Sequence, residues 1–390
     1  MPDGAQFSRE PRDQDALAAM RRAGEPDPAP DSPSRTLARR GRGAVTNPTS
    51  RYDRQSTSAF EDGWSFLTGD GDEPPPLQTT LTPDRSKSAI SWNDSPDIGF
   101  DRAVNPYRGC EHGCIYCYAR PSHAYLGYSP GLDFETQIVF KPDVAALLER
   151  ELSKPGYQPR TLALGSNTDP YQPVERTLRL TRSVLEVLER FGHPVSIVTK
   201  SAGVLRDLDI LRRLASRGLV RVFLSITTLD AALARRMEPR ASAPALRLRT
   251  IEALTQAGVP AGVLAAPMIP GLNDAELEHI LAAAHRAGAR HAGYVLLRLP
   301  LELRDLFTAW LNEHVPDRAR RVLALIRETR AGALNDSRFH DRFTGAGPYA
   351  DLLAQRFARV RSKLGFGGRD PLDQTQFRPP PRVGAQLSLL

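Results

Sequence analysis

Residues 195–227 read VSIVTKSAGVLRDLDILRRLASRGLVRVFLSIT, and this stretch decides the fold class. Its two ends, residues 195–200 and 220–227, are short apolar runs rich in β-branched residues, as expected of strands that are buried on both faces. The apolar residues between them recur at helical spacing and are Val204, Leu208, Leu211 and Ala215. A strand, a helix and a second strand in this order predict two parallel strands joined by a right-handed crossover.

The same alternation continues in both directions along the chain. Further strands are predicted at residues 103–107, 161–165, 261–267 and 292–298, and further helices at 143–153, 180–191 and 277–284. About six β/α units result, so we expect an α/β fold built as a partial (β/α)6 TIM-like barrel. An open doubly wound sheet fits the alternation as well. Helical patterns at 304–311, 317–329 and 349–364 predict a helical C-terminal extension.

Composition divides the chain into four parts. Residues 1–75 are rich in Pro, Gly, Ser and Arg and lack apolar periodicity, which predicts a mostly disordered N-terminal tail. A lead-in at 76–103, the barrel at 104–300 and an extension with a tail at 301–390 follow. The basic segment 35–43 could contact nucleic acid, but a flexible solvated tail is the interpretation that we favour.

The overall composition limits the environment of the protein. With 41% hydrophobic residues the chain can bury a substantial core, but it has no apolar run of about 18 residues that would span a membrane. The N-terminus has no secretory pattern, and closely spaced thiols outside disulfides suit the cytoplasm. The formal net charge of +7 is compatible with an anionic partner.

The chain has three cysteines, and all lie in the segment NPYRGCEHGCIYCY at residues 105–118: Cys110, Cys114 and Cys117. Three thiolates on one bent loop can hold three corners of an iron–sulfur cube and leave the fourth iron open. Zinc is the alternative, with His112 or His123 as a fourth ligand, and it would make the protein a non-enzymatic zinc-binding interaction module. Three closely spaced cysteines cannot all pair as disulfides.

Polar residues follow several of the predicted strands at their carboxyl ends, where parallel α/β folds bind ligands. The loop 165–175 contains Ser166 and Asp169, which could bind an ammonium or a hydroxyl group; a turn that caps the next helix is the alternative. Lys200 ends the next strand and could pair with a ligand carboxylate. The other candidates at strand ends are Ser225, Thr227, Glu238, Arg240 and Arg298. We expect Glu238 and Arg240 to pair with each other, and Arg298 to suit an anionic substrate group.

The cysteine segment, with Tyr116 before its last cysteine, resembles the CxxxCxxC signature of the radical S-adenosylmethionine (radical SAM) superfamily. By this resemblance the loop that contains Ser166, Thr168 and Asp169 faces the methionine amino group, and Ser225 contacts the ribose. Residues 267–274 resemble the GxIxGxxE motif near the adenine, with Ile269 and Gly271 kept, Pro267 in place of the first glycine and Asp274 in place of the glutamate. Segments 168–171 and 199–201 are similar to the spore photoproduct lyase–like, or DNA repair photolyase–like, group and to a bacterial branch of it.

The resemblance implies a [4Fe–4S] cluster and S-adenosyl-L-methionine as cofactors. It also implies reductive formation of a 5′-deoxyadenosyl radical and an external one-electron donor such as ferredoxin or flavodoxin. The substrate class that it suggests is nucleic acid, with a protein, a peptide or a small metabolite as the alternative. Spore photoproduct lyase uses a further cysteine as hydrogen donor, and this chain has none left once three bind the cluster. A tyrosine such as Tyr118, Tyr125 or Tyr294 could take that role.

Overall fold

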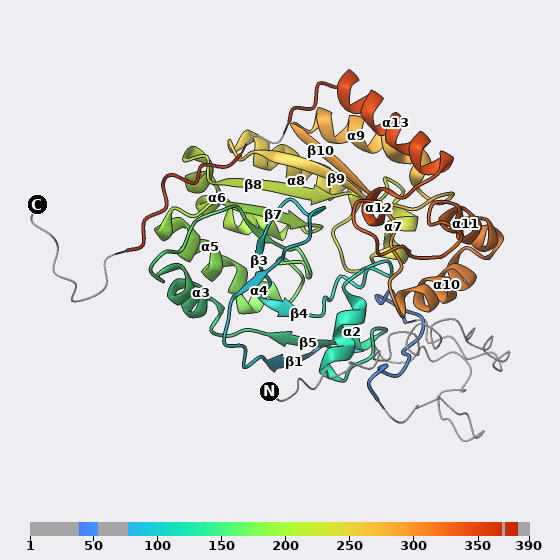
Figure 1. Cartoon of the computed structure of the whole chain (residues 1–390), viewed down its shortest axis with the longest axis horizontal. Coiled ribbons are helices and arrows are strands. Elements are labelled where there is room, and N and C mark those ends of the chain that lie inside the picture. The colour runs from blue at the N-terminus through green and yellow to red at the C-terminus, as the bar shows by residue number, and fades with distance from the viewer. Residues whose placement is uncertain (1–38, 54–76, 369–370, 381–390) are drawn as a thin grey trace, which may run out of the picture. The chain divides into compact units, whose positions relative to one another are not determined.

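Six parallel strands of the described chain form the barrel wall, and they lie side by side in the order in which they occur in the sequence (Figure 1). β2 pairs antiparallel with β3 at one edge, and β10 forms the other edge. The strands are β2 (Ile90–Trp92), β3 (Arg102–Val104), β6 (Leu162–Leu164), β7 (Val195–Thr199), β8 (Val220–Ser225), β9 (Ala261–Met268) and β10 (His291–Leu296). The computed structural model describes residues 39–53, 77–368 and 371–380.

This strand order distinguishes the two architectures that the sequence left open. A doubly wound sheet reverses its strand order at a switch point, whereas here the order runs from β3 to β10 without reversal. The partial (β/α)6 barrel is therefore confirmed, and the doubly wound alternative is wrong.

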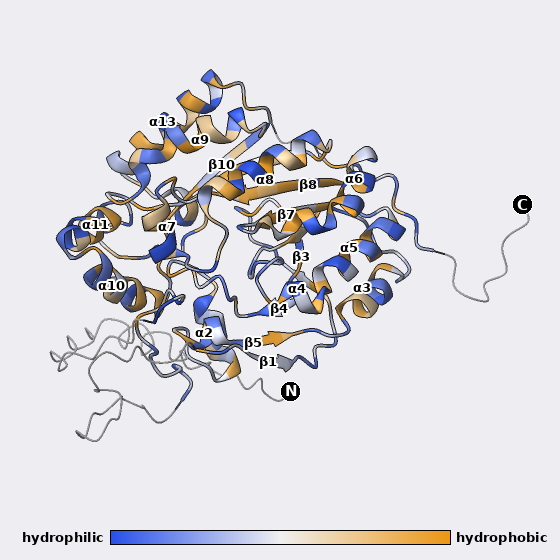
Figure 2. Ribbon diagram, turned by 180° about the vertical axis from the view of Figure 1, so that it is seen from behind, coloured by the Kyte–Doolittle hydropathy of each residue, from blue (hydrophilic) through white to orange (hydrophobic). Residues whose placement is uncertain are grey.

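Amphipathic helices cover the outside of the barrel. In α5, Val184, Leu188 and Phe191 are fully buried, and each such side chain contributes roughly 1.5–3 kcal/mol to stability. Figure 2 shows the consequence, because β8 is mostly hydrophobic while the helices carry both colours. The main covering helices are α3 (Val144–Leu152), α5 (Leu180–Phe191), α6 (Leu208–Ser216), α8 (Pro244–Gln256) and α9 (Leu277–Arg286).

Short helical segments lie between strand ends and covering helices, where the chain turns at the carboxyl end of the barrel. They are α4 (Glu175–Leu178), η3 (Ala202–Asp207), α7 (Ala231–Met237) and η4 (Asp274–Glu276). Neither α7 nor α8 was predicted. In α8 the buried face includes Arg247 and Thr250, so its apolar stripe is broken.

A second, three-stranded sheet holds both ends of the cysteine loop. β5 (Gln137–Phe140) pairs parallel with β1 (Thr80–Pro83) and antiparallel with β4 (Tyr107–Arg108). The cysteines, η2 (Arg120–Leu126) and α2 (Asp133–Thr136) all lie between β4 and β5. The predicted first strand at 103–107 is thus two strands, separated at Pro106, which has no N–H group to donate.

Residues 39–53, here called the strap, pack against the cysteine loop. Ala44 and Val45 are at most 1% exposed and belong to the same apolar cluster as Cys114 and Ile115. The Arg42 guanidinium donates to Glu135 O at 2.8 Å and to Leu77 O at 2.5 Å.

The strap corrects two predictions made from composition. The expectation of a mostly disordered tail over residues 1–75 does not apply to 39–53, which pack against the barrel, and the rest of that range lies outside the described residues. In the basic segment 35–43, Arg42 is bound within the protein and is not available to nucleic acid.

The helical extension predicted after the barrel is present and packs beside the cysteine loop. Trp310 is fully buried, donates from Nε1 to Arg236 O at 3.1 Å, and shares an apolar cluster with Ile115 and Tyr116. The helices are α10 (Leu303–His314), α11 (Pro316–Glu328), α12 (Asp341–Thr344) and α13 (Pro348–Lys363). In the part of the chain that is described, no helix has the length and apolar character needed to span a membrane.

Substitution of Gly43 tests the packing of the strap. Gly43→Ala should lower the free energy of unfolding by about 1–3 kcal/mol, because the added Cβ would lie 1.8 Å from Gly113 O. Urea denaturation under anaerobic conditions measures the change. Gly99→Ala is the control, since its Cβ would meet no atom within 4 Å. Equal effects of the two substitutions would contradict the close contact.

Candidate metal centre and cofactor site

The cysteine loop follows β4 and is fixed by main-chain hydrogen bonds to two distant segments. Cys110 N donates to Phe134 O, and Ile115 N donates to Met237 O, both at 2.9 Å. Gly109 and Gly113 have φ values of +79° and +68°, a region that disfavours residues with a Cβ. The glycines on either side of Cys110 therefore allow the bends that keep the three cysteines on one short loop.

The buried ion pair of Arg120 and Glu135 holds the cysteine loop in place. Arg120 Nε donates to Cys114 O at 2.9 Å, its NH2 group donates to Gly113 O at 3.0 Å, and it lies 2.5 Å from Glu135 Oε1. Both side chains are 0% exposed. Glu135 also accepts the N–H groups of Gly43 and Ala44, at 2.9 and 2.8 Å. One carboxylate thus connects the strap to the cysteine loop.

Cys110 and Cys114 are buried and Cys117 is partly exposed, an environment that suits metal-bound thiolates. Burial raises the pKa of Cys110 and Cys117, and that of Cys114 to about 12. The charges of Lys200 and Arg247 act in the opposite direction on Cys114. Main-chain hydrogen bonds from Asp169 to Cys110 and from residues 119 and 120 to Cys117 likewise favour the thiolates.

This donor set fits an iron–sulfur cluster, because iron would supply the positive charge that buried thiolates need. Among the described residues, no three His, Cys, Asp or Glu side chains are grouped to bind a single metal ion. In a cube each thiolate binds a different iron atom, so the sulfur atoms need not surround one ion.

A second buried ion pair supports the residue before Cys117. The Tyr116 hydroxyl donates to Glu238 and lies 3.0 Å from Thr227 Oγ1. Glu238 Oε1 lies 2.6 Å from the guanidinium of Arg247, which also donates to Ser225 O at 2.9 Å. The predicted pair of Glu238 and Arg240 is wrong, because Arg240 instead lies 3.2 Å from Glu111.

Lys200 and Ser225 meet beside Cys114. Lys200 Nζ donates to Ser225 Oγ at 3.0 Å and lies 5.6 Å from the centre of the Tyr116 ring. Ser225 Oγ in turn donates to Ala266 O at 3.0 Å. No carboxylate of the described residues forms an ion pair with Lys200, so its charge remains open toward the cysteine loop.

The polar loop after β6 is largely occupied by contacts within the protein. Asp169 accepts from Thr199 Oγ1 and from Lys200 N, both at 2.7 Å, and lies 3.3 Å from His112 Nδ1. Burial raises the pKa of Asp169, but His112 and these donors outweigh it and bring the pKa to about 2. The carboxylate therefore connects the ends of β6 and β7 to the cysteine loop.

Ser166 and Thr168 have similar structural contacts. Thr168 Oγ1 donates to Tyr107 O at 2.9 Å, and Ser166 Oγ accepts from Asn105 at 3.2 Å. The Tyr118 hydroxyl donates to Ser166 O. Of the predicted residues in this loop, Ser166 is the more accessible, because Thr168 is only 2% exposed.

The loop after β9 is a tight turn held by its own side chains. Ile269 N donates to Asn273 Oδ1 at 2.6 Å, and Gly271 N donates to Asp274 Oδ1 at 2.8 Å. Gly271 has a φ of +74°, which explains the glycine. Asp274, which stands where the motif has a glutamate, also accepts from the Tyr349 hydroxyl at 2.5 Å and so connects the turn to α13.

The two histidines that could have completed a zinc site are in different environments. His112 is 2% exposed and faces Asp169. His123 stacks on Tyr128 and meets the edge of Phe134, and burial lowers its pKa to about 4, so it is neutral at physiological pH.

Sequence reasoning missed the residues that hold the site together. Glu135 binds the strap 91 and 92 residues earlier in the chain. Arg120 and Arg247 pair with carboxylates 15 and 9 residues away, at spacings for which the sequence gives no signal. The one available hint was a charged residue on an otherwise apolar helix face, which describes Arg247 in α8.

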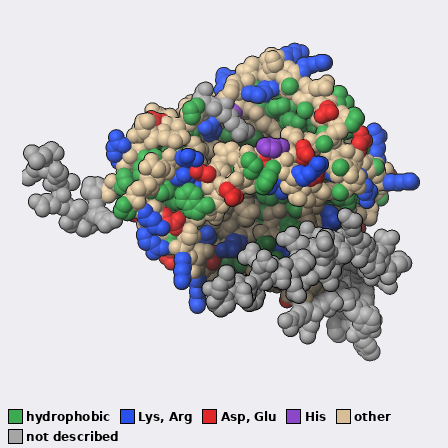
Figure 3. Space-filling view, in the orientation of Figure 1, with side chains coloured by type: hydrophobic (Ala, Val, Ile, Leu, Met, Phe, Trp, Pro, Cys, Tyr) green, Lys and Arg blue, Asp and Glu red, His purple; other side chains and the backbone are tan. Residues whose placement is uncertain are grey.

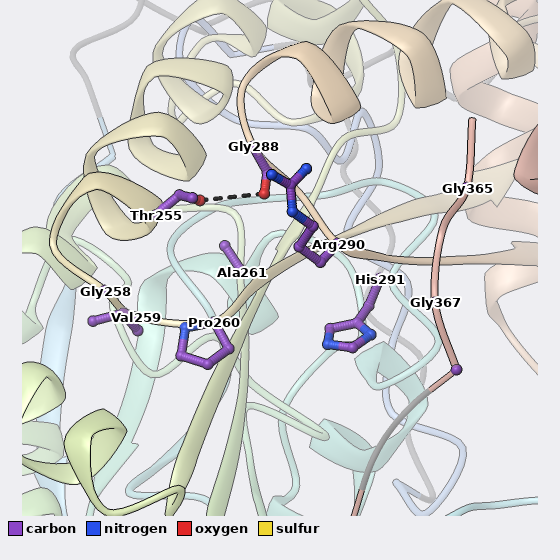
Figure 4. A pocket seen from close by; sticks show the side chains of 11 residues that line it. Thr255, Gly258, Val259, Pro260, Ala261, Gly288, Arg290, His291, Gly365 and Gly367 are labelled. Atoms are coloured by element: carbon purple, nitrogen blue, oxygen red, sulfur yellow. Dashed lines mark hydrogen bonds between the residues drawn. The ribbon is translucent and has the colours of Figure 1, made fainter.

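A separate hollow lies at the opposite end of the barrel, where β9 and β10 begin (Figure 4). Its volume is about 510 Å³, and Pro260, Arg290, His291 and Gly367 are among the residues that line it. Because it lies at the amino ends of the strands, it is not part of the cysteine site.

Comparisons with known proteins agree with this geometry. The sequence profile of the radical SAM superfamily matches residues 104–284. An uncharacterised protein of Mycobacterium tuberculosis is 39% identical over 273 residues, which cover 70% of this chain and 76% of that protein. An uncharacterised protein of Methanocaldococcus jannaschii is 29% identical over 192 residues, covering 49% and 69%.

The fold is similar to that of a solved enzyme. Spore photoproduct lyase complexed with dinucleoside spore photoproduct superposes with a TM-score of 0.52 at 17% identity, covering 73% of this chain and 78% of that one. At this identity the likeness concerns the fold alone. From the profile match and the mycobacterial relative, the chain belongs to the radical SAM superfamily and is an enzyme of that class.

Proposed function

We propose that Cys110, Cys114 and Cys117 hold a [4Fe–4S] cluster whose fourth iron binds S-adenosylmethionine. When bound, the cluster would pass one electron from an external donor to S-adenosylmethionine, whose cleavage to methionine would supply the 5′-deoxyadenosyl radical for removing a hydrogen atom from a substrate carbon. The observation that carries the proposal is the loop of three thiols, two of them buried and that of Cys117 partly exposed, with the open cation of Lys200 beside it.

The proposed contacts of S-adenosylmethionine combine the open ammonium of Lys200 with the positions that the family resemblance indicates. The Lys200 ammonium binds its carboxylate, and Ser225, which Lys200 already contacts, binds the ribose. The turn that contains Ile269 and Gly271 lies against the adenine. Ser166 faces the methionine end, while Thr168 and Asp169 act by holding their loop in place.

The surrounding residues keep water away from the reacting groups. Cys110 and Cys114 are 7% and 8% exposed, and the apolar cluster around Ile115 and Trp310 closes one side of the loop. Exclusion of water protects a reactive carbon radical from side reactions. The electron comes from a partner protein such as ferredoxin or flavodoxin.

For the substrate we propose nucleic acid. The net charge of +7 favours a polyanion, and Lys and Arg side chains are spread over the face seen in Figure 3. The solved protein of similar fold was complexed with a dinucleoside photoproduct, which adds support for a nucleic-acid base as the site of reaction.

Loss of any one cysteine should abolish the chemistry. After anaerobic reconstitution, the unchanged protein should contain about four irons per chain and make 5′-deoxyadenosine when reduced with dithionite. Cys110→Ala, Cys114→Ala and Cys117→Ala should each lose most of the iron and all of this product. Ser216→Ala, at an exposed site on α6, is the control. A colourless protein with one zinc, or equal product from Cys114→Ala, would contradict the proposal.

Removal of the Lys200 charge should weaken cofactor binding without loss of iron. Lys200→Met should raise the Kd for S-adenosylmethionine about tenfold or more, because a charge-assisted hydrogen bond is lost. Equilibrium binding to the reconstituted protein measures this. The exposed Lys154→Met should bind as the unchanged protein does. An unaltered Kd in Lys200→Met would remove Lys200 from the cofactor site.

The buried pair beside Tyr116 should be required for stability. Arg247→Met and Glu238→Gln should each cost about 3–5 kcal/mol, since either leaves an uncompensated buried group. The double variant should cost less than the sum, as urea denaturation would show. Arg213→Met breaks the exposed pair with Glu189 and should cost about 1 kcal/mol or less. Additive costs in the double variant would show that the pair is not coupled.

A further inference from the structure

Arg298 lies just beyond β10, at the same end of the barrel as the cysteines, and is held between two aromatic rings. Its guanidinium carbon lies 5.6 Å from the ring centre of Tyr118 and 4.9 Å from that of Phe343. Such stacking fixes the plane of a guanidinium and leaves its N–H groups to point outward in that plane. The side chain is therefore positioned before any ligand arrives.

The charge of Arg298 is not neutralised by the described residues. None of their carboxylates forms an ion pair with it, and its buried Nε has no hydrogen-bond acceptor among them. Burial and the nearby Arg342 lower the pKa of Arg298, which reflects the cost of keeping this cation half-buried without an anion.

The neighbouring charged groups increase the positive field. Arg330 is 2% exposed, and its guanidinium donates to the carbonyl groups of Leu297 and Asp341 rather than to a carboxylate. Of the nearby acidic groups, Asp97 is bound by Arg342, while Asp336 and Asp341 act on Arg330 through space without forming an ion pair with it. Two guanidinium groups, those of Arg298 and Arg330, thus lack a carboxylate partner in the described chain.

Arg298 lies close to the cysteine loop, where a substrate would bind. Tyr118, on which Arg298 stacks, follows Cys117 directly, and its hydroxyl donates to Ser166 O. The guanidinium therefore lies on the rim of the barrel mouth, between the loop after β6 and the C-terminal extension. Lys200 and Ser225 come from β7 and β8, separated from β10 by β9.

We propose that Arg298, held between Tyr118 and Phe343, binds a phosphate group of the substrate. The inference rests on the proposed function, since it names the residue that binds the substrate in the same site. A stacked guanidinium presents a planar fork that fits phosphate oxygens in a bidentate manner. The uncompensated charge of Arg330 adds to the attraction, and the half-exposed ring of Tyr118 offers a face on which a base can stack.

Binding of inorganic phosphate to the reconstituted protein tests the proposal. Isothermal titration calorimetry is done without reductant and without S-adenosylmethionine, with sodium chloride and sodium acetate at equal ionic strength as comparisons. We expect phosphate to bind more tightly than acetate, Arg298→Gln to weaken phosphate binding about tenfold, and Arg298→Lys to weaken it less. Arg304→Gln, at an exposed position in α10, should bind phosphate as the unchanged protein does.

Several outcomes would overturn the inference. These are no phosphate binding above the chloride background, equal binding by Arg298→Gln and the unchanged protein, or acetate bound as tightly as phosphate. Circular dichroism shows whether Arg298→Gln is folded. If it is not, Arg298→Lys is the deciding variant, because it keeps the positive charge and lacks the planar guanidinium. Phosphate binding by Arg298→Lys equal to that of the unchanged protein then overturns the proposal. The measurement needs no radical chemistry, so a failure of the proposed function would appear separately, as absent 5′-deoxyadenosine.

Discussion

The site depends on one buried ion pair, that of Arg120 and Glu135. Arg120 binds carbonyl groups of the cysteine loop, and Glu135 binds both Arg120 and the main chain of the strap, so the cysteine loop, α2 and the distant strap meet at two side chains. Both groups are fully buried, and removal of one would leave the other as an unpaired charge in the interior. The position of the three thiols is therefore set by electrostatics as much as by apolar packing.

The charges around the barrel mouth fall into two kinds. Glu135 with Arg120, and Glu238 with Arg247, neutralise each other and give the cysteine loop a rigid support on two sides. Lys200 and Arg298 have no carboxylate partner among the described residues and come from different strands. Paired charges thus build the site, and open charges remain for ligands, one for the cofactor and one for the substrate in our proposals. The composition and position of the loop 165–175 suggested that Asp169 is open to a ligand. Instead, its carboxylate is bound within the protein.

Local patterns predicted the barrel well. Strands that are buried on both faces appear in the sequence as continuous apolar runs, and amphipathic helices appear as apolar residues at helical spacing. Strand positions such as 195–200 and 261–267 lie close to the observed β7 and β9. The prediction failed where polar residues occupy buried positions. Arg247 and Thr250 break the apolar stripe of α8, and Arg42 with two glycines makes the strap resemble a solvated tail. In each case a hydrogen-bonding partner elsewhere in the chain makes the burial favourable.

The sequence by itself determined the parallel α/β alternation and the three residues that suit a cluster. These follow from periodicity and spacing, which are local properties. Only the tertiary structure decided which polar side chains are bound within the protein and which stay open. Glu238 pairs with Arg247 rather than Arg240, Asp169 is bound by three neighbouring groups, and Lys200 and Arg298 form no ion pair with a carboxylate of the described residues. The physical reason is that the partner of a buried charge is chosen by distance in space, which sequence spacing does not encode.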